Sequence, residues 1–413
     1  MKAPTGAFML FGMDPIDALL RLHYAGGHCA WLRRLLERSA DASEALHGPE
    51  SAWLAAGAPA AARRMALEPQ AKTRVGATRQ WLEAAPQRHA IGWGEADYPS
   101  LLRHAPSPPA VLFVEGHMER LWWPQIAVVG SRAPTSAGLQ RAARFARAFA
   151  DAGFVVTSGL ASGIDGAAHA ACLREPGTIA VMATGSDLCF PPAHAALKSA
   201  IVEQGCVITE HAPGVQAKRE HFPSRNRIIA GLSLATVVVE AAERSGALIT
   251  ARLAAESGRE VFALPGSPEN PKARGCHRLI REGVTLADDP AQVIEALAGA
   301  ASQAAPRLRQ RLERMNGQQD MSDLFSKDSS PESPPHTPRD AIVCSPEHAP
   351  VLAALGDEGA AFDDLLERTG LTSNALAPIL LDMELTGRLT QQHGHYVPCR
   401  SAPQTRAEQQ RRR

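Results

Sequence analysis

Two short glycine-containing segments, residues 130–132 and 158–166, carry residue types that bind phosphate. Glycine allows the backbone to approach an anion closely, and the guanidinium of Arg132 offers planar donors that suit a phosphate group. Where such a segment leads from a strand into a helix, its free backbone N–H groups also face an anion. The candidate anion-binding residues of these two segments are Gly130, Ser131, Arg132, Ser158, Gly159 and Gly163.

A third segment, residues 212–227, concentrates cations around an aromatic ring. Four basic side chains stand against a single acid, Glu220, and Phe222 lies between the basic pairs. This composition fits a groove for single-stranded nucleic acid, where cations hold phosphates and a ring stacks on a base. It fits a solvated loop with a buried Phe222 equally well. The candidates in this segment are Lys218, Arg219, Phe222, Arg225, Asn226 and Arg227.

A fourth segment, residues 245–250, opens with Ser245 and Gly246 and is either another anion site or a helix cap. None of the four segments matches a nucleotide-cofactor motif. The loop after residue 129 lacks G-x-G-x-x-G, and the chain has no G-x-x-x-x-G-K-[ST] element. We therefore expect neither NAD binding nor ATP hydrolysis, and we predict no cofactor.

Catalysis has weaker support in the sequence than phosphate binding. Asp165 and His169 lie four residues apart, so one helix face could hold them as an acid–base pair. The favoured interpretation is an Asp that complements the helix dipole and orients a partly buried His. Glu240 could serve as a general base, yet no nucleophile or metal cluster accompanies it in the sequence. We predict no catalytic residues and no metal site.

Short apolar runs that alternate with helix-length segments must position these candidates. They predict one doubly wound α/β domain at about residues 123–298, with a parallel sheet and helices on both faces. The predicted strands are 126–129, 154–157, 178–182, 206–209, 235–239 and 260–264. A helix between the first two strands is expected to have its cap at Ser136 and its end at Gly153. Ligands of such sheets bind beyond the carboxyl ends of the strands, where the four segments lie.

The flanks of this domain differ from it in composition. The N-terminal residues are Ala- and Leu-rich with helical spacing, and Gly26-Gly27 is a helix C-cap or, less favoured, a phosphate-facing turn. A Ser/Pro-rich flexible linker follows the α/β domain. Three short helices and a hairpin at 389–397 then resemble a winged helix. Its third helix carries Asp382 and Glu384 without a cation before Arg388, which favours protein contact over DNA reading.

Composition limits the partner classes. The 413 residues include 43 Lys+Arg and 43 Asp+Glu, so the formal net charge is zero and a uniformly basic coat is excluded. The seven scattered cysteines form no C-x-x-C pair, which favours reduced thiols in a cytoplasmic protein. No apolar run approaches the roughly 18 residues of a membrane-spanning helix. Any anionic partner must therefore meet a local patch of charge.

Taken in order, these segments resemble the DprA/Smf family of DNA-processing proteins. The resemblance covers residues 95–298 most strongly. It rests on Gly-Ser-Arg at 130–132, Ser-Gly-Leu-Ala-Ser-Gly-Ile-Asp at 158–165, Phe-Pro-Ser-Arg-Asn-Arg-Ile-Ile-Ala-Gly-Leu-Ser at 222–233 and Ser-Gly-Ala-Leu-Ile-Thr-Ala at 245–251. It implies that Arg132 contacts phosphate, that Arg219 and Phe222 supply cation and stacking contacts, and that the turns at Gly159 and Gly163 meet the DNA backbone.

The resemblance also implies an architecture and a function. It predicts a helical domain at 1–90 similar to helix-hairpin-helix modules, an extended Rossmann-like domain at 91–299, a linker at 300–345, a winged-helix-like domain at 346–400 and a basic tail at 401–413. Members of the family form homodimers, bind and protect single-stranded DNA, and help load the RecA recombinase onto it during natural transformation. They are not known for an enzymatic activity.

The sequence departs from the family pattern at two places, and two other functions stay open. Ala183 replaces the first glycine of the G-x-G-x-D element, which is followed by Phe190-Pro191 instead of Tyr-Pro, and His277 replaces an Asn. The first alternative is a Rossmann-like hydrolase of nucleoside monophosphates with Glu240 or the Asp165/His169 pair as acid and base, although its P-G-G-x-G-T turn is absent. The second is an adaptor whose output is protein contact through residues 345–398.

Overall fold

The computed structural model describes residues 13–26 and 30–302 and, between 351 and 398, the helical and strand residues of a smaller unit. Contacts within the chain define two compact units, Met1–Lys327 and Asp328–Arg413. The predicted linker lies outside the described residues except for residues 300–302, which are helical, and the predicted basic tail lies wholly outside them.

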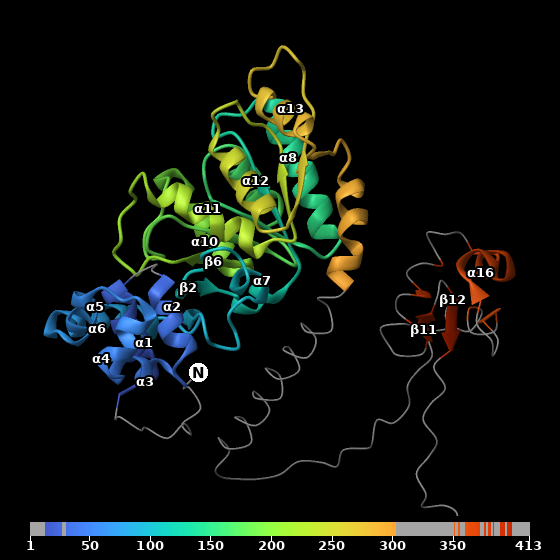
Figure 1. Cartoon of the computed structure of the whole chain (residues 1–413). Helices are drawn as coiled ribbons and strands as arrows, with labels where there is room; N and C mark the ends of the chain where they lie inside the picture. The colour runs from blue at the N-terminus through green and yellow to red at the C-terminus, as the bar shows by residue number, and fades with distance from the viewer. Residues whose placement is uncertain are drawn as a thin grey trace, which may run out of the picture. The chain divides into compact units, whose positions relative to one another are not determined.

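A nine-stranded sheet forms the centre of the first unit, in the order β1-β2-β6-β5-β4-β3-β7-β8-β9 (Figure 1). The strands are β1 (Arg88–Gly92), β2 (Val111–Gly116), β3 (Gln125–Val129), β4 (Val155–Ser158), β5 (Thr178–Val181), β6 (Cys206–Thr209), β7 (Ala235–Val238), β8 (Glu260–Ala263) and β9 (Thr285–Leu286). Every neighbouring pair from β6 to β9 is parallel, whereas β1 and β2 are antiparallel to their neighbours. The doubly wound α/β prediction is confirmed, and the antiparallel edge is an addition to it.

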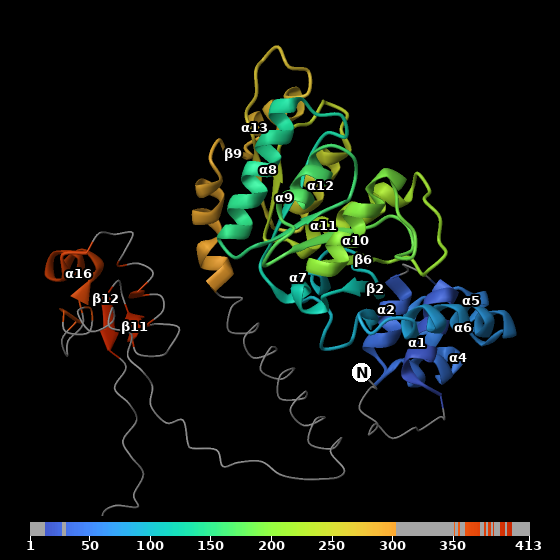
Figure 2. The same ribbon diagram turned by 180° about the vertical axis from the view of Figure 1, so that it is seen from behind.

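Helices cover both faces of this sheet (Figures 1 and 2). On one face, α8 (Ser136–Asp151) and α9 (Ile164–Ala171) pack through residues such as Phe145 and Ile164. On the other, α11 (His221–Leu232) and α12 (Gly246–Glu256) pack through residues such as Ile228 and Leu248. The other helical elements of this domain are α7 (Ser100–Arg103), η1 (Met118–Trp122), η2 (Pro192–His194), α10 (Ala195–Gln204), α13 (Arg274–Arg281) and a helix at 290–302.

The beginning of α8 differs from the prediction by one residue. Its N-cap is Thr135, not Ser136, because the Thr135 backbone is extended and its hydroxyl accepts a hydrogen bond from the Gly138 N–H at 3.0 Å. The predicted end is confirmed, since the helix stops at Asp151 and Gly153 takes a left-handed φ of 83°.

In the described residues six helices precede the sheet, and the first five contribute to an apolar cluster around Trp31 and Trp53. The six are α1 (Pro15–Gly26), α2 (Ala30–Glu37), α3 (Ala42–His47), α4 (Glu50–Ala56), α5 (Ala60–Leu67) and α6 (Pro69–Glu83). A Cβ at Gly26 would overlap the indole of Trp31, so this glycine permits close helix packing. Gly27 lies outside the described residues. The helices contact the sheet through Phe113 of β2, whose ring meets those of His23 and Trp81.

The second unit contains a three-stranded antiparallel sheet, ordered β10-β12-β11, and the helix α16 (Phe362–Thr369). Its strands are β10 (Ala360–Ala361), β11 (Leu389–Gln392) and β12 (His395–Pro398). The predicted hairpin at 389–397 is therefore confirmed. Asp382 and Glu384, on which the preference for protein contact rested, lie outside the described residues. Across the described parts of both units, we find no helix with the length and apolar character needed to cross a membrane.

Candidate nucleic-acid interface

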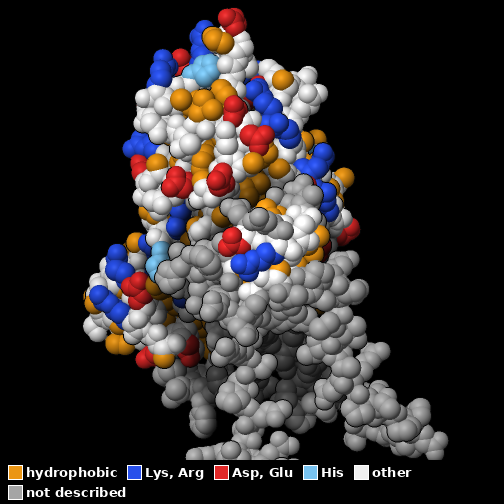
Figure 3. Space-filling view, turned by 90° about the vertical axis from the view of Figure 1, so that its right-hand side faces the viewer, with side chains coloured by type: hydrophobic (Ala, Val, Ile, Leu, Met, Phe, Trp, Pro, Cys, Tyr) orange, Lys and Arg blue, Asp and Glu red, His pale blue; other side chains and the backbone are white. Residues whose placement is uncertain are grey.

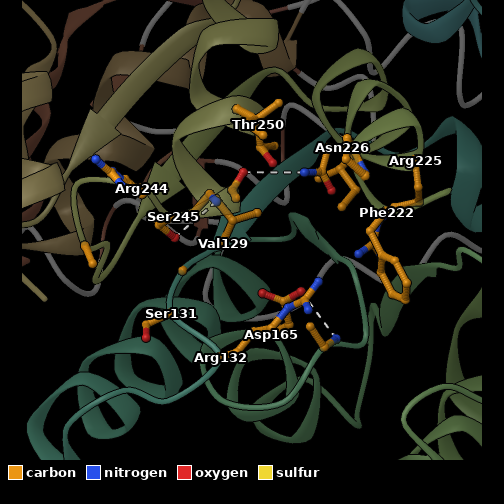
Figure 4. A pocket seen from close by; sticks show the side chains of 18 of the residues that line it. Val129, Ser131, Arg132, Asp165, Phe222, Arg225, Asn226, Arg244, Ser245 and Thr250 are labelled. Atoms are coloured by element: carbon orange, nitrogen blue, oxygen red, sulfur yellow. Dashed lines mark hydrogen bonds between the residues drawn. The ribbon is translucent and has the colours of Figure 1, made fainter. Parts of the chain in front are cut away.

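A cavity of about 760 Å³ lies at the carboxyl ends of β3 and β7, where the order of the strands reverses direction along the chain. Open α/β sheets bind their ligands at this kind of switch point. Figure 4 shows side chains from the end of β3, from α11 and from the start of α12 surrounding the cavity. The structure thus brings together parts of all four predicted segments. The predicted site residues that line it are Gly130, Ser131, Arg132, Arg219, Phe222, Arg225, Asn226, Ser245 and Gly246.

Backbone hydrogen bonds join the two glycine-containing turns, residues 130–132 and 158–166, to each other and to the end of β7. The Ser131 N–H donates to the Glu240 carbonyl at 2.7 Å, and the Ile164 N–H donates to the Ser131 carbonyl at 3.2 Å. Gly163 takes a left-handed φ of 84°, and a Cβ there would also lie 2.6 Å from the ring of Pro134. A side chain at Gly163 would therefore push the two turns apart. Gly163 acts in packing, and it does not line the cavity.

Arg132 and Phe222 form the feature most relevant to nucleic acid. The guanidinium of Arg132 lies over the Phe222 ring, 5.1 Å from its centroid, which is a cation–π contact. Arg132 comes from the loop after β3 and is exposed, whereas Phe222 stands half-buried in the first turn of α11. Both residues were predicted as separate candidates, and the structure places them in contact.

The segment 212–227 is not the single basic loop that the sequence suggested, because its last seven residues belong to α11. Arg225 is only 4% exposed and donates to the carbonyls of Gly159 and Val181. Burial is the largest influence on its guanidinium and lowers the pKa of Arg225 to about 10, so it remains charged at neutral pH. Arg225 lines the cavity, but its guanidinium hydrogen-bonds to the backbone of the turn at residues 158–166.

Arg227 is likewise committed to an internal partner. It forms an ion pair with Glu210, which is fully buried, and it does not line the cavity. Lys218 is exposed and also lies outside the lining. Among the described residues, the exposed cations that line the cavity are Arg132, Arg219 and Arg244, and none of the three forms an ion pair with a described residue. Arg244 was not among the predicted candidates, although it directly precedes Ser245 in the fourth segment.

The polar side chains of the second segment, residues 158–166, form hydrogen bonds inside the protein. The Ser158 hydroxyl is buried and donates to the Val128 carbonyl at 2.6 Å, which corrects its placement among the anion-contacting groups. Asp165 accepts from the Gly159 N–H at 3.2 Å and from the Ala161 N–H at 3.4 Å. Burial raises the pKa of the Asp165 carboxyl, against the opposing charge of Arg225.

His169 holds the same turn from another side. Its Nε2 accepts from the Leu160 N–H at 3.3 Å, and its Nδ1 lies 2.9 Å from the Thr178 hydroxyl. Burial lowers the pKa of His169 to about 3, so the ring is neutral at physiological pH. Leu160 itself takes a left-handed φ of 55°. Asp165 and His169 therefore have structural roles at this turn, but the favoured interpretation is confirmed only in part, because His169 is fully buried and its hydrogen bonds go to Leu160 and Thr178 instead of Asp165.

Glu240 is a structural carboxylate. It is 1% exposed and accepts hydrogen bonds from the Thr135 N–H at 2.9 Å and the Thr135 hydroxyl at 2.5 Å. Arg141 donates to it at 3.2 Å. A negative group at this position stabilises the N-terminus of α8 through the helix dipole. These contacts hold the carboxylate inside the protein, and Glu240 does not line the cavity.

The fourth segment is a helix cap. The Ser245 hydroxyl accepts from the Ala247 N–H at 3.3 Å, so the cap interpretation is confirmed. Ser245 and Gly246 nevertheless line the cavity, and the Asn226 amide donates to the Gly246 carbonyl at 3.4 Å. This hydrogen bond joins the start of α12 to α11.

The fold and the cavity together define a doubly wound α/β protein with a cation-lined cavity at its switch point. The family described as DNA recombination-mediator protein A matches residues 89–298, and the DprA winged helix domain matches residues 329–395. The chain belongs to the DprA/Smf family of DNA-processing proteins. The predicted resemblance and the winged-helix prediction are thereby confirmed.

Individual relatives agree with this assignment. Protein Smf of Escherichia coli strain K12 is 38% identical over 326 residues, covering 78% of this chain and 80% of the relative. Protein Smf of Synechocystis is 36% identical over 310 residues, covering 73% and 77% respectively. The crystal structure of DNA processing protein A from Streptococcus pneumoniae superposes with a TM-score of 0.58 at 31% identity, over 68% of this chain and 98% of that one.

Proposed function

We propose that the chain is a cytoplasmic recombination mediator that binds single-stranded DNA in the cavity at β3 and β7, protects it and helps load RecA onto it during natural transformation. It acts as a homodimer and has no enzymatic activity of its own. The observation that carries the proposal is the Arg132 guanidinium over the Phe222 ring, with Arg219 and Arg244 on the same cavity walls. Such cations hold phosphates, and such a ring stacks on a base.

The position of Phe222 favours a single strand over a duplex. The ring lines a recess instead of standing on a flat surface, so a base must leave its stack to reach it. Unpairing a base costs a few kcal/mol in a duplex and is already complete in a single strand. The backbone of a single strand can also follow cations on two walls of a cavity. We therefore expect preference for single-stranded over double-stranded DNA.

The distribution of charge supports recognition of DNA at the cavity itself. On the face shown in Figure 3, basic and acidic side chains are interspersed, in keeping with the zero net charge. Long-range attraction of DNA to such a surface is weak. Affinity must then come from the few exposed guanidinium groups at the cavity.

The roles of the buried acids support a non-enzymatic function. Glu240 accepts hydrogen bonds from Thr135, the N-cap of α8, while Asp165 and His169 hydrogen-bond to backbone N–H groups of the turn at Leu160. These are the residues that a nucleoside-monophosphate hydrolase would need as acid and base. Each of them is engaged in maintaining the backbone that forms the cavity. We therefore favour binding over hydrolysis.

Two substitutions test the DNA site. Arg132→Ala should reduce the slope of log K against log salt by about 0.7, because one phosphate contact to a single strand is lost. Phe222→Ala should weaken binding by about 1–3 kcal/mol with little change in slope. Fluorescence anisotropy with labelled dT oligomers over a salt series measures both. Arg252→Ala is the control, since Arg252 is an exposed cation on α12 outside the cavity lining.

Unchanged affinity and slope in both variants would remove this cavity from the DNA site. Loading of RecA is tested separately, by the lag before RecA hydrolyses ATP on DNA covered by a single-strand-binding protein. Wild-type protein should shorten the lag, and Arg132→Ala should do so less. Sedimentation of the full chain tests the homodimer.

A further inference from the structure

Phe190 is an exposed aromatic ring at the mouth of the cavity. Its side chain is 45% exposed, although it belongs to a residue type that is usually buried. It comes from the segment between β5 and η2, which was noted in the sequence only as a departure from the family pattern. Phe190 lines the cavity together with Phe222.

The two phenylalanines form an aromatic corner. Their ring centroids are 5.3 Å apart and their planes meet at 61°, an edge-to-face arrangement. The Arg132 guanidinium already lies over the Phe222 ring. Phe190 is the more exposed of the two rings, so it presents open aromatic surface to a ligand at the cavity mouth.

A second exposed apolar side chain also lines the cavity. Ile249, on α12, lines the same cavity and is 42% exposed. Exposed large hydrophobic residues on two walls of one cavity indicate an apolar, flat ligand between cationic groups. Arg132 and Arg219 supply those cationic groups. A nucleobase attached to a phosphate backbone has this combination of properties.

We propose that Phe190 is a second stacking platform, which binds the base next to the one at Phe222. This inference rests on the proposed single-stranded DNA function and specifies its recognition site. Because the two rings meet at 61°, two neighbouring bases that stack on them cannot remain stacked on each other. The cavity therefore binds a dinucleotide step with its bases splayed apart. Base–ring stacking tolerates any base, so no sequence preference is expected from this corner.

The test compares one-base and multi-base ligands in binding to the full chain. Phe190→Leu retains an apolar side chain against Phe222 but removes the aromatic face. It should raise the Kd for dT12 by about 5- to 150-fold and leave the Kd for thymidine 5′-phosphate unchanged, because a single base needs only one platform. Phe190→Tyr keeps the ring and should bind dT12 like the wild type.

Two results would overturn the inference. One is an unchanged Kd of Phe190→Leu for dT12. The other is an equal loss for dT12 and for the mononucleotide, which would show that Phe190 merely positions Phe222. Leu54→Ala is the matched control, since Leu54 is an exposed apolar residue on α4 outside the cavity. If the wild-type protein fails to bind dT12, the proposed function itself is wrong. If the wild-type protein binds dT12 and only Phe222→Ala weakens this binding, the Phe190 platform alone is rejected.

Discussion

Replacing Arg225 should unfold the protein more readily, whereas replacing its exposed neighbour Arg219 should weaken DNA binding. Arg225→Met leaves the carbonyls of Gly159 and Val181 without the Arg225 donor and removes the positive charge that favours the ionised form of the buried Asp165. Hydrogen bonds to charged groups contribute about 1.5–3 kcal/mol each, and the loss of the guanidinium charge that acts on Asp165 adds to this cost. These contributions overlap, so we expect a loss of about 3–5 kcal/mol in unfolding free energy.

Urea unfolding of the full chain, followed by tryptophan fluorescence, measures this loss. Arg219→Met is the matched control, because Arg219 is exposed and forms no ion pair with a described residue. It should change the unfolding free energy by less than about 0.5 kcal/mol and should weaken the binding of dT oligomers. Asp165→Asn should cost less in the Arg225→Met background than in the wild type, since the unpaired charge is then removed.

The structural role of Arg225 would be refuted by a loss below about 1 kcal/mol with DNA affinity reduced as in Arg219→Met. That outcome would mean that its guanidinium is available to phosphate. An equal cost of Asp165→Asn in both backgrounds would show that the two buried charges do not interact.

Three other perturbations separate the roles of buried groups from those of the binding surface. The pKa of His169 is about 3 in the folded protein and about 6.5 when unfolded, so the unfolded state takes up a proton first as the pH drops below 6.5. The free energy of unfolding should therefore fall by up to about 1.4 kcal/mol per pH unit in this range. Urea unfolding between pH 7 and 5 should show a shallower pH dependence in His169→Gln. Glu240→Gln should destabilise the protein by about 2–4 kcal/mol, and neither form should release base from nucleoside monophosphates; turnover that disappears in Glu240→Gln would support the hydrolase instead. Removing residues 346–413 should leave the Kd for dT12 within a factor of about two, and a larger loss would place part of the DNA site in the winged-helix unit.

The parallel strands were predictable because each is buried on both faces and is therefore continuously apolar. The edge strands lack this signal. β1 runs from Arg88 to Gly92, includes a histidine and is only partly buried, so neither an apolar run nor an alternating pattern marks it. The two-residue β9 is too short to leave any pattern. Its pairing depends on its position beside β8, which the sequence does not show.

The segments that form the candidate site were predictable from the sequence. Which of their side chains face the cavity and which have internal partners was not. Arg225 and Arg227 have internal partners at Val181 and Glu210, which lie far away in sequence. Helical spacing could have identified Arg225, because it shares a face with Ile228, Ile229 and Leu232. No comparable pattern marks Phe190, since its proximity to Phe222 arises from the fold alone.

Salt-dependent competition for labelled dT12 tests the proposed binding of single strands most directly. Wild-type protein should retain labelled dT12 in the presence of duplex DNA or heparin at concentrations where unlabelled dT12 displaces it. Phe222→Ala should lose this selectivity, because the remaining cations do not distinguish among polyanions. Displacement of dT12 by duplex DNA and heparin as readily as by dT12 itself would contradict a stacking site for unpaired bases.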